Sequence, residues 1–471
     1  MNRRRLGLLL LDMVLTIAVF EISHRIYRSS TGLPQLCDST YSLLAAEKIL
    51  TTGSANLREH ISADVEVRKQ MHGYTPSSDL PYQFITHAAP QASQAAIYYG
   101  YPLGSTFLSM PLLKYYLAKR GMTVVREDGQ PNLEAEALLQ QRIASRVSAA
   151  TTALFYVVAR FFCPPLLAAV LALGFGLGSP VWSTLSRSLW SHTWMVFWLT
   201  AAIALLVWSN RRDVKTWASS IPLGIGLGTA LFAIAVTRPH GVLSAGPIVL
   251  YLLLRDRRMA LATILTGGIW MTGYVVASYS VFGVPTPPSV YEPDPIDGHD
   301  VLRRLGWLMF SPSRGLLLYC PYLVVLGGWL VVYRKSLRDV GLLIPAALSC
   351  GAYVAVFSMY NGWHAGSSYG PRYFSDLIPW FVLVGAMSLD SLRRADTSCM
   401  RKGIEATILA ATFAWAIWVH GRGANSPEAW EWNYLSITMG PEEAARDWRY
   451  PQFLAGITFA AKPDGSVVAL K

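Results

Sequence analysis

Long apolar runs recur along almost the whole chain, and they constrain its fold more than any other feature. Most have roughly 17–25 residues, enough for a helix to cross a hydrocarbon core about 30 Å thick. Of the 471 residues, 52% are hydrophobic and only 15% are charged, a composition too apolar for soluble domains. The sequence therefore predicts an all-α polytopic membrane protein. We expect about eleven transmembrane helices, at 6–27, 147–162, 166–183, 190–208, 217–236, 240–254, 260–281, 315–333, 340–358, 377–391 and 404–420.

The basic residues report on topology. The formal charge of +11 could indicate binding to nucleic acid, but the cations lie in short clusters between apolar runs, so we predict no nucleic-acid partner. With eleven crossings, every cluster falls on the same side as the arginines at 3–5, and the positive-inside rule places the amino terminus in the cytoplasm. The clusters are Arg211/Arg212/Lys215, Arg255/Arg257/Arg258, Arg334/Lys335/Arg338 and Arg393/Arg394/Arg401/Lys402.

One further stretch, 98–118, is apolar enough to cross but contains Gly100, Pro102, Gly104 and Pro111. A crossing here would move the later basic clusters outside, so we predict an in-plane or re-entrant helix instead. Residues 28–146 then form one large external loop, which also carries an amphipathic helix at 42–50 that could lie on the membrane surface. The predicted parts are a first transmembrane helix at 1–27, the loop at 28–146, a bundle at 147–420 with external loops at 184–189, 237–239, 282–314 and 359–376, and an external tail at 421–471.

Asp38 is the first acidic residue after the first span, and it lies just before the amphipathic helix. One interpretation is structural: aspartate is favoured at the N-cap of a helix, where it accepts a hydrogen bond from a free backbone N–H. The other is functional: a carboxylate at the membrane boundary can accept a proton or bind a metal ion. The residues alone leave both interpretations open.

The densest polar segment is 361–373, where glycines and a proline give an irregular backbone around His364, Tyr369 and Arg372. A guanidinium suits a phosphate group, because its fork of donors stays charged and bonds two oxygens at once. The alternative is an interfacial arginine whose side chain snorkels to the membrane surface beside Tyr373. The segment therefore predicts either an anion site or an interfacial belt.

Two more arginines, Arg314 and Arg238, are expected at the outer ends of spans. The positive-inside rule depletes cations on that side, so three arginines there favour a functional role. Tyr101 lies in the aromatic segment 98–104, which returns the chain to the membrane surface. It completes the set of candidate substrate-binding residues, although interfacial aromatics are also common in turns at this depth.

These features together resemble the GT-C superfamily of membrane glycosyltransferases, which take sugars from polyprenyl-phosphate donors outside the cytoplasmic membrane. The resemblance covers most of the chain and implies a GT-C-like fold. It also implies a multi-pass protein of the bacterial cytoplasmic (inner) membrane with its active site facing the periplasm or exterior. It is carried by Asp38 at the head of the first external loop, by segments 98–104, 237–239, 311–315, 363–366 and 370–373, and by 447–454, which is similar to the ending of uncharacterised bacterial members.

The resemblance implies transfer of a sugar from a polyprenyl-phosphate-linked donor to a glycan, lipid or protein acceptor, with inversion at the sugar. Asp38 would be the base, and Arg372, helped by Arg314 or His364, would bind the donor phosphate. Many relatives, such as protein O-mannosyltransferases and aminoarabinose transferases, carry another acid in or near the first or second external loop. The second loop here, 186–192, contains none, so a two-carboxylate metal site is not supported and we assign no metal ligand, while a divalent metal cofactor stays open.

Two other functions fit the same sequence features. A transporter or flippase of a lipid-linked sugar would need the phosphate-binding cations but no base, and a non-catalytic assembly subunit would need only the fold. Charged residues at the midplane of the spans are sparse, with Asp12 the clearest acid, and the chain shows no inverted repeat. Both observations favour the enzyme over the transporter.

Overall fold

The structure, a computed structural model, describes residues 3–33, 35–61, 84–87, 96–211, 216–282, 285–286 and 298–470. It is mostly helical, and each apolar run of the sequence coincides with a helix over all or most of its length. These helices are α1 (Arg3–Ser29), α6 (Leu133–Arg160), α7 (Pro165–Leu177), α8 (Ser191–Asn210), α9 (Trp217–Thr237), α10 (Val242–Arg255), α11 (Arg257–Phe282), α14 (Tyr322–Val332), α15 (Leu343–Ser358), α16 (Ile378–Arg394) and α17 (Cys399–Asn425).

Seven helices among the described residues are long and apolar enough to cross a membrane: α1, α8, α9, α11, α15 and α16, the last two with the turns before them, and α17. Helices α7 and α14 are apolar but shorter, and the first half of α6 carries charged residues. The chain is therefore an all-α membrane protein, while the expected number of eleven crossings stays a prediction.

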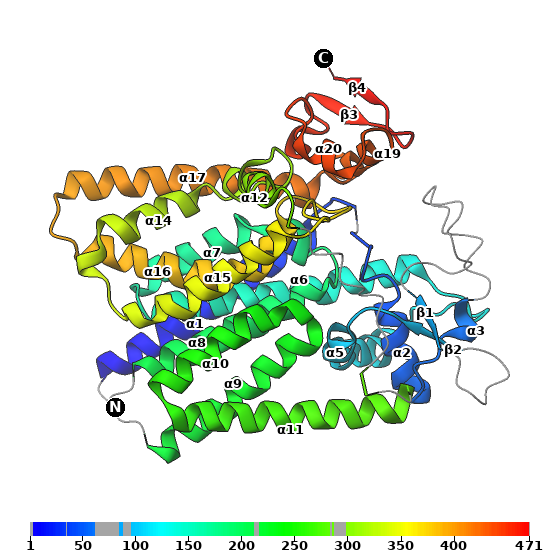
Figure 1. The fold of residues 1–471 in the computed structure, drawn as a ribbon, viewed down its shortest axis with the longest axis horizontal. Coiled ribbons are helices and arrows are strands. Elements are labelled where there is room, and N and C mark those ends of the chain that lie inside the picture. Colours follow the sequence, from blue (N-terminus) through cyan, green and yellow to red (C-terminus); the bar gives the residue numbers. More distant parts are fainter. Residues whose placement is uncertain are drawn as a thin grey trace.

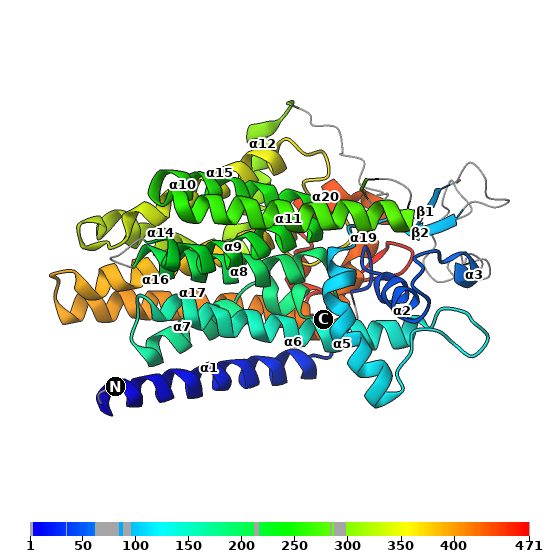
Figure 2. The same ribbon diagram turned by 90° about the horizontal axis from the view of Figure 1, so that it is seen from below.

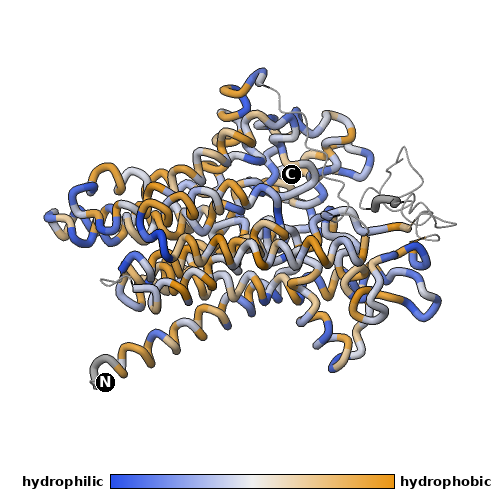
Figure 3. The backbone as a smooth tube through the Cα atoms, turned by 60° about the horizontal axis from the view of Figure 1, so that its bottom comes forward, coloured by the Kyte–Doolittle hydropathy of each residue, from blue (hydrophilic) through white to orange (hydrophobic). Residues whose placement is uncertain are grey.

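The outward faces of several long helices are apolar. Met13 and Val14 of α1 each expose 61% of their surface, and Ile269 of α11 exposes 72%. A soluble monomer rarely shows apolar faces of this extent to water, because their hydration is unfavourable. A lipid surrounding suits them, and Figure 3 shows hydrophobic residues running along the bundle with hydrophilic residues gathered at its ends and in the loops.

The long helices lie side by side, and the amino terminus is at one end of the bundle (Figures 1 and 2). Basic residues far apart in the sequence meet at this end. Arg211 pairs with Asp339 at 2.9 Å, and Lys402 Nζ donates to the backbone oxygen of Arg393 at 3.1 Å. We call this the basic end of the bundle and the other the site end. The gathering of the cations at the amino-terminal end agrees with the arrangement expected from the positive-inside rule.

The first large loop folds at the site end. It contains α2 (Ser42–Thr52), α3 (Arg58–Ile61), an antiparallel pair of strands, β1 (Phe84–His87) and β2 (Ala96–Tyr99), and α5 (Gly104–Arg120). Helix α5 covers most of the ambiguous stretch at 98–118, and Figure 2 shows it lying across the direction of the long helices rather than along them. It is not among the helices that are long and apolar enough to span, so the structure agrees with an additional helix that does not cross.

Helix α2 is buried, contrary to the expectation that it lies on the membrane surface. Leu43, Leu44 and Ala46 are fully buried in a cluster with residues of α5 and α6. Helix α5 is the main partner of α2, and the first half of α6 joins the same cluster. Helix α6 begins at Leu133, well before the apolar run at 147, and an apolar window alone does not detect a half-helix that carries charged residues.

The connecting segments at the site end are helical turns and short helices, and the tail forms a small lobe beside the end of α17 that lies there (Figure 1). The connections are η1 (Val181–Leu185), η2 (Pro239–Gly241), α12 (Val301–Phe310), α13 (Leu316–Tyr319) and η5 (Arg372–Leu377), with η3 (Arg334–Ser336) and η4 (Val340–Leu342) at the basic end. The lobe contains α18 (Pro427–Glu431), η6 (Trp432–Tyr434), α19 (Leu435–Met439), α20 (Pro441–Arg446), η7 (Gln452–Leu454) and the hairpin of β3 (Phe459–Ala461) and β4 (Val467–Ala469).

The topology can be tested with single cysteines in a variant whose five native cysteines, at 37, 163, 320, 350 and 399, are serine. We expect Asp128→Cys, in the turn before α6, to react in intact cells with a maleimide that cannot cross the membrane. A second variant that keeps only the exposed Cys399, at the basic end, should react only after the membrane is opened. Labelling of both residues from the same side would contradict the predicted crossings.

Candidate functional site

Asp38 and Arg372, 334 residues apart in the sequence, meet at the site end. Arg372 Nη1 donates to Asp38 Oδ2 at 3.4 Å. Asp38 is not the N-cap of α2, because that position is occupied by Tyr41 in a left-handed conformation. The backbone N–H of Leu43 in the first turn is instead bonded by the buried Glu136 of α6, at 3.1 Å. The capping interpretation of Asp38 is therefore wrong, and its carboxylate faces a cation.

Two tyrosines, one at the end of β2 and one just after it, hold Asp38 in place. Tyr99 donates its hydroxyl to the Asp38 backbone oxygen at 2.6 Å, and Tyr101 donates to Asp38 Oδ1 at 3.4 Å. The Asp38 side chain keeps 31% of its surface exposed. A carboxylate with one cation, one hydroxyl and open surface is positioned by the protein but still accessible to a ligand.

Arg372 lies over aromatic rings at the start of η5. Its guanidinium carbon is 4.5 Å from the centre of the Trp190 ring and 5.7 Å from that of Tyr373. Cation–π contacts of this kind hold a guanidinium in a plane without using its N–H donors. The side chain is 11% exposed, and its Nε is buried without a hydrogen-bond partner among the described residues. Arg372 therefore has donor capacity that the described part of the protein does not use.

Arg314 differs from Arg372, because all five of its N–H donors are used by the protein. Nε donates to the His364 backbone oxygen at 2.7 Å, and the remaining donors reach the backbone oxygens of Ser313 and Gly366 and the side chains of Asn433 and Gln452. Burial lowers its pKa to about 10, which still leaves it charged at pH 7. Arg314 thus ties the 359–376 segment to the tail, and its predicted role in binding phosphate would require it to give up these bonds.

Arg238 is paired with an acid that the sequence analysis did not single out. Its Nε donates to Asp376 Oδ2 at 2.7 Å, and Nη1 donates to Ser191 at 3.1 Å. His192 Nδ1 lies 2.7 Å from the other carboxylate oxygen of Asp376. All three charged or titratable residues are buried. Arg238 therefore balances a buried carboxylate, as a buried charge requires.

The triad of His192, Arg238 and Asp376 also positions Arg372. Asp376 lies four residues after Arg372 in η5, and it connects this turn to the ends of α8 and α9 that lie at the site end. Trp190, whose ring lies under Arg372, directly precedes α8. One buried carboxylate therefore holds both the cation and its aromatic support. No local motif signals this role, because the partners of Asp376 lie far away in sequence.

His364 and Tyr369 have structural contacts. His364 Nδ1 accepts from the Gly366 backbone N–H at 3.2 Å, and burial, followed by the Arg314 charge, lowers the His364 pKa from 6.5 to about 4. The neutral ring thus stabilises the fold above about pH 6.5, and this contribution is lost as the pH falls toward 4. Tyr369 is buried against α17 and donates to the Val419 backbone oxygen at 2.7 Å. Both residues lie in the segment that carries Arg372, but no described contact links either to Asp38.

The described residues contain no group of three or more His, Cys, Asp or Glu side chains that could hold a metal ion. Near Arg372 a narrow hollow is lined by Leu308, Arg314, Trp363 and residues 370–374. A larger hollow, of about 510 Å³, lies at the site end of α17 and shares no lining residue with the first.

No family model matches the chain, and a search of curated proteins gives no match.

Arg314 and Arg372 differ in how many of their donors the protein bonds, so we predict that their substitution lowers the stability of the protein by different amounts. Arg314→Gln should lower the melting temperature strongly, because it leaves several buried acceptors unpaired, each costing about 1–3 kcal/mol. Arg372→Gln should have a smaller effect, because the residue makes one long bond to a partly exposed carboxylate. Thermal unfolding of both purified variants in one detergent tests this order, and equal melting temperatures would contradict it.

Asp376→Asn should be among the most destabilising conservative substitutions in the chain. It leaves Arg238 buried without a charged partner, a change that typically costs about 3–5 kcal/mol. The control is Asp300→Asn, which breaks the exposed Asp300–Arg303 pair and should cost less than about 1 kcal/mol. Melting temperatures that are the same for the two variants would show that the buried triad does not hold the site end together.

Proposed function

We propose that this protein is a membrane glycosyltransferase of the GT-C type. It moves a sugar from a polyprenyl-phosphate donor to an acceptor outside the cytoplasm, which is a cell-envelope glycan, a lipid or a protein. Asp38 is the base and Arg372 binds the donor phosphate. The proposal places the protein in the bacterial inner membrane, with the site end facing the periplasm or exterior.

The observation that carries the proposal is the unused donor capacity of Arg372 beside a partly exposed carboxylate. Arg314 has all of its donors bonded, and Arg238 is paired with Asp376. Arg372 makes one hydrogen bond of 3.4 Å to Asp38, and its buried Nε is without a described partner. A buried, unpaired donor on a charged group is costly unless a ligand completes its bonding. An anionic phosphate oxygen would do so.

The chemistry needs a base and a cation with different tasks. The acceptor hydroxyl oxygen forms a bond to the anomeric carbon of the sugar, and the bond from that carbon to the phosphate oxygen breaks. The proton of the hydroxyl passes to the Asp38 carboxylate. The leaving phosphodiester becomes a phosphate monoester and gains negative charge, which Arg372 stabilises most strongly in the transition state.

A single displacement requires the entering and leaving oxygens to lie on opposite sides of the anomeric carbon. In inverting glycosidases, which also place one group on each side of the sugar, the two carboxyl groups stand roughly 6.5–9.5 Å apart, whereas Asp38 and Arg372 are in contact at 3.4 Å. We infer that this contact is the resting state and that donor binding separates the pair. The length of the bond and the partial exposure of Asp38 make the contact weak, and the donor phosphate would replace Asp38 as the partner of the buried Arg372.

The central experiment uses a strain from which the gene has been removed. Comparing its cell-envelope glycans by mass spectrometry with those of the parent strain should reveal a missing sugar residue, which names donor and acceptor together. Returning the wild-type gene should restore the residue, while Asp38→Asn should not, although the variant is inserted and folded. Asp300→Asn is the matched control, because it removes an exposed carboxylate at the same end of the molecule.

Purified protein in detergent separates the enzyme from the alternatives. Incubated with a panel of polyprenyl-phosphate sugars and with envelope extract from the deletion strain, wild-type protein should release polyprenyl phosphate, and Asp38→Asn should release less than about 1% of that amount. A flippase only moves the donor between two compartments, and an assembly subunit has no activity of its own. Neither would release polyprenyl phosphate in detergent. Full activity of Asp38→Asn would eliminate the assignment of the base.

A further inference from the structure

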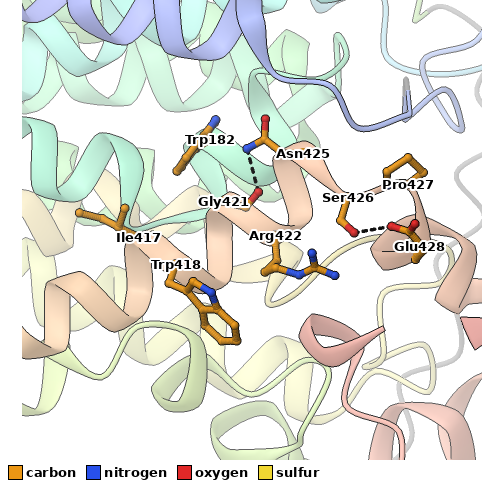
Figure 4. Close-up of a pocket in the computed structure, with 9 residues that line it drawn as sticks. All are labelled: Trp182, Ile417, Trp418, Gly421, Arg422, Asn425, Ser426, Pro427 and Glu428. Carbon is orange, nitrogen blue, oxygen red and sulfur yellow. Dashed lines mark hydrogen bonds between the residues drawn. The ribbon is translucent and has the colours of Figure 1, made fainter. Parts of the chain in front are cut away.

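The larger of the two hollows described above lies at the site end of α17, away from Asp38. Figure 4 shows Trp182 of η1 on one side and Trp418 and Arg422 of α17 beside it, with α18 beyond the end of the helix. Its walls are mostly apolar. Asn425 and the turn into α18 close it, and the lining comprises Trp182, residues 417–418, 421–422 and 425–428.

The surface around this hollow faces lipid. On α17, Ile408, Trp415 and Trp418 are 46%, 39% and 41% exposed. Trp415 Nε1 donates to the Leu318 backbone oxygen, so its ring is held in a fixed position. Tryptophans at the end of an apolar helix mark the level of the lipid headgroups. The molecule that reaches the hollow from this side is therefore a membrane lipid.

The polar end of the hollow carries one group of each charge. Arg422 Nε and Nη2 donate to the backbone oxygens of Phe453 and Ala455, so the guanidinium is held rigidly by the tail lobe. A guanidinium has five N–H donors, and its Nη1 group has no recorded bond in the described part of the chain. The guanidinium can therefore be fixed by the protein and still bind a phosphate.

Glu428 supplies the opposite charge. Its Oε2 accepts from the Ser426 hydroxyl at 2.6 Å, and this bond, a backbone hydrogen bond and the nearby Arg422 lower the pKa of Glu428, so it is ionised at pH 7. The described contacts include no ion pair between Glu428 and Arg422. Two opposite charges lie at one rim of the hollow without forming an ion pair. They suit a ligand that carries a negative and a positive group.

We infer that this hollow binds the headgroup of a zwitterionic phospholipid that carries a phosphate and a primary ammonium, as phosphatidylethanolamine does. Arg422 binds the phosphate and Glu428 binds the ammonium. The acyl chains lie against the apolar wall of α17 between Trp182 and Trp418. The carboxylate of Glu428 disfavours a lipid whose headgroup is only anionic, and the proposed sugar donor is such a lipid. Binding of the phospholipid is therefore independent of the proposed sugar transfer.

The test is native mass spectrometry of the purified wild-type protein after exchange into mixed detergent with equal amounts of phosphatidylethanolamine and phosphatidylglycerol. The wild type should retain phosphatidylethanolamine with roughly tenfold preference, the effect expected for one hydrogen bond to a charged group. Glu428→Gln should remove the preference, and Glu428→Lys should reverse it in favour of phosphatidylglycerol. Glu443→Gln, which removes an exposed acid elsewhere in the tail lobe, is the matched control and should bind lipid like the wild type.

Two outcomes would overturn the inference. One is a wild type without preference between the two lipids, and the other is an unchanged preference in Glu428→Gln. Preferential retention of added polyprenyl phosphate over phosphatidylethanolamine in the wild type would also overturn it, since the hollow would then belong to the donor. Glycan transfer by Glu428→Gln, measured as above, is a separate readout, so failure of the lipid site is distinguishable from failure of the proposed function.

Discussion

The arrangement of the site end depends on one buried carboxylate and its need for partners. Asp376 cannot stay charged in an apolar interior unless cations and donors surround it. His192 and Arg238 meet this need from the ends of α8 and α9. Because Asp376 lies in the same turn as Arg372, satisfying the buried charge also sets the direction of Arg372. The start of α8 also places Trp190 next to the Arg372 guanidinium. The partners of one buried carboxylate therefore position both the cation and its aromatic contact.

Helix positions were predictable because length and hydropathy are properties of single segments. The apolar runs coincide with helices, and the extra helix near 98–118 exists and lies across the bundle (Figure 2). Helix α6 was missed over its first half because that half carries charged and polar residues and is buried by contact with α2, α5 and the turn before α8. A hydropathy window indicates whether a single segment prefers lipid or water. It does not indicate whether the segment is buried by another part of the protein.

The candidate site was predictable only in part, for the same reason. Arg238, Arg314 and Arg372 look alike in the sequence, since each lies next to a predicted span on the side expected to be external. Their different roles depend on partners far away: Asp376 is 138 residues from Arg238, and Gln452 is 138 residues from Arg314. Asp38 showed the reverse difficulty. Its sequence position fits a helix cap, and only the placement of Tyr41 and Glu136 leaves its carboxylate for Arg372.

The contrast among the arginines links stability to the proposed chemistry. A guanidinium whose donors are all bonded contributes to the fold and cannot follow a ligand without losing those bonds. Arg372 is held by aromatic faces and by the turn that Asp376 anchors, so its position is defined while its donors are spared. A protein that must bind a lipid phosphate and then release it needs a cation of this kind, because a charge already neutralised by a strong partner would gain little from the ligand. The long contact with Asp38 fits such a cation, since it compensates the buried charge until a phosphate takes its place.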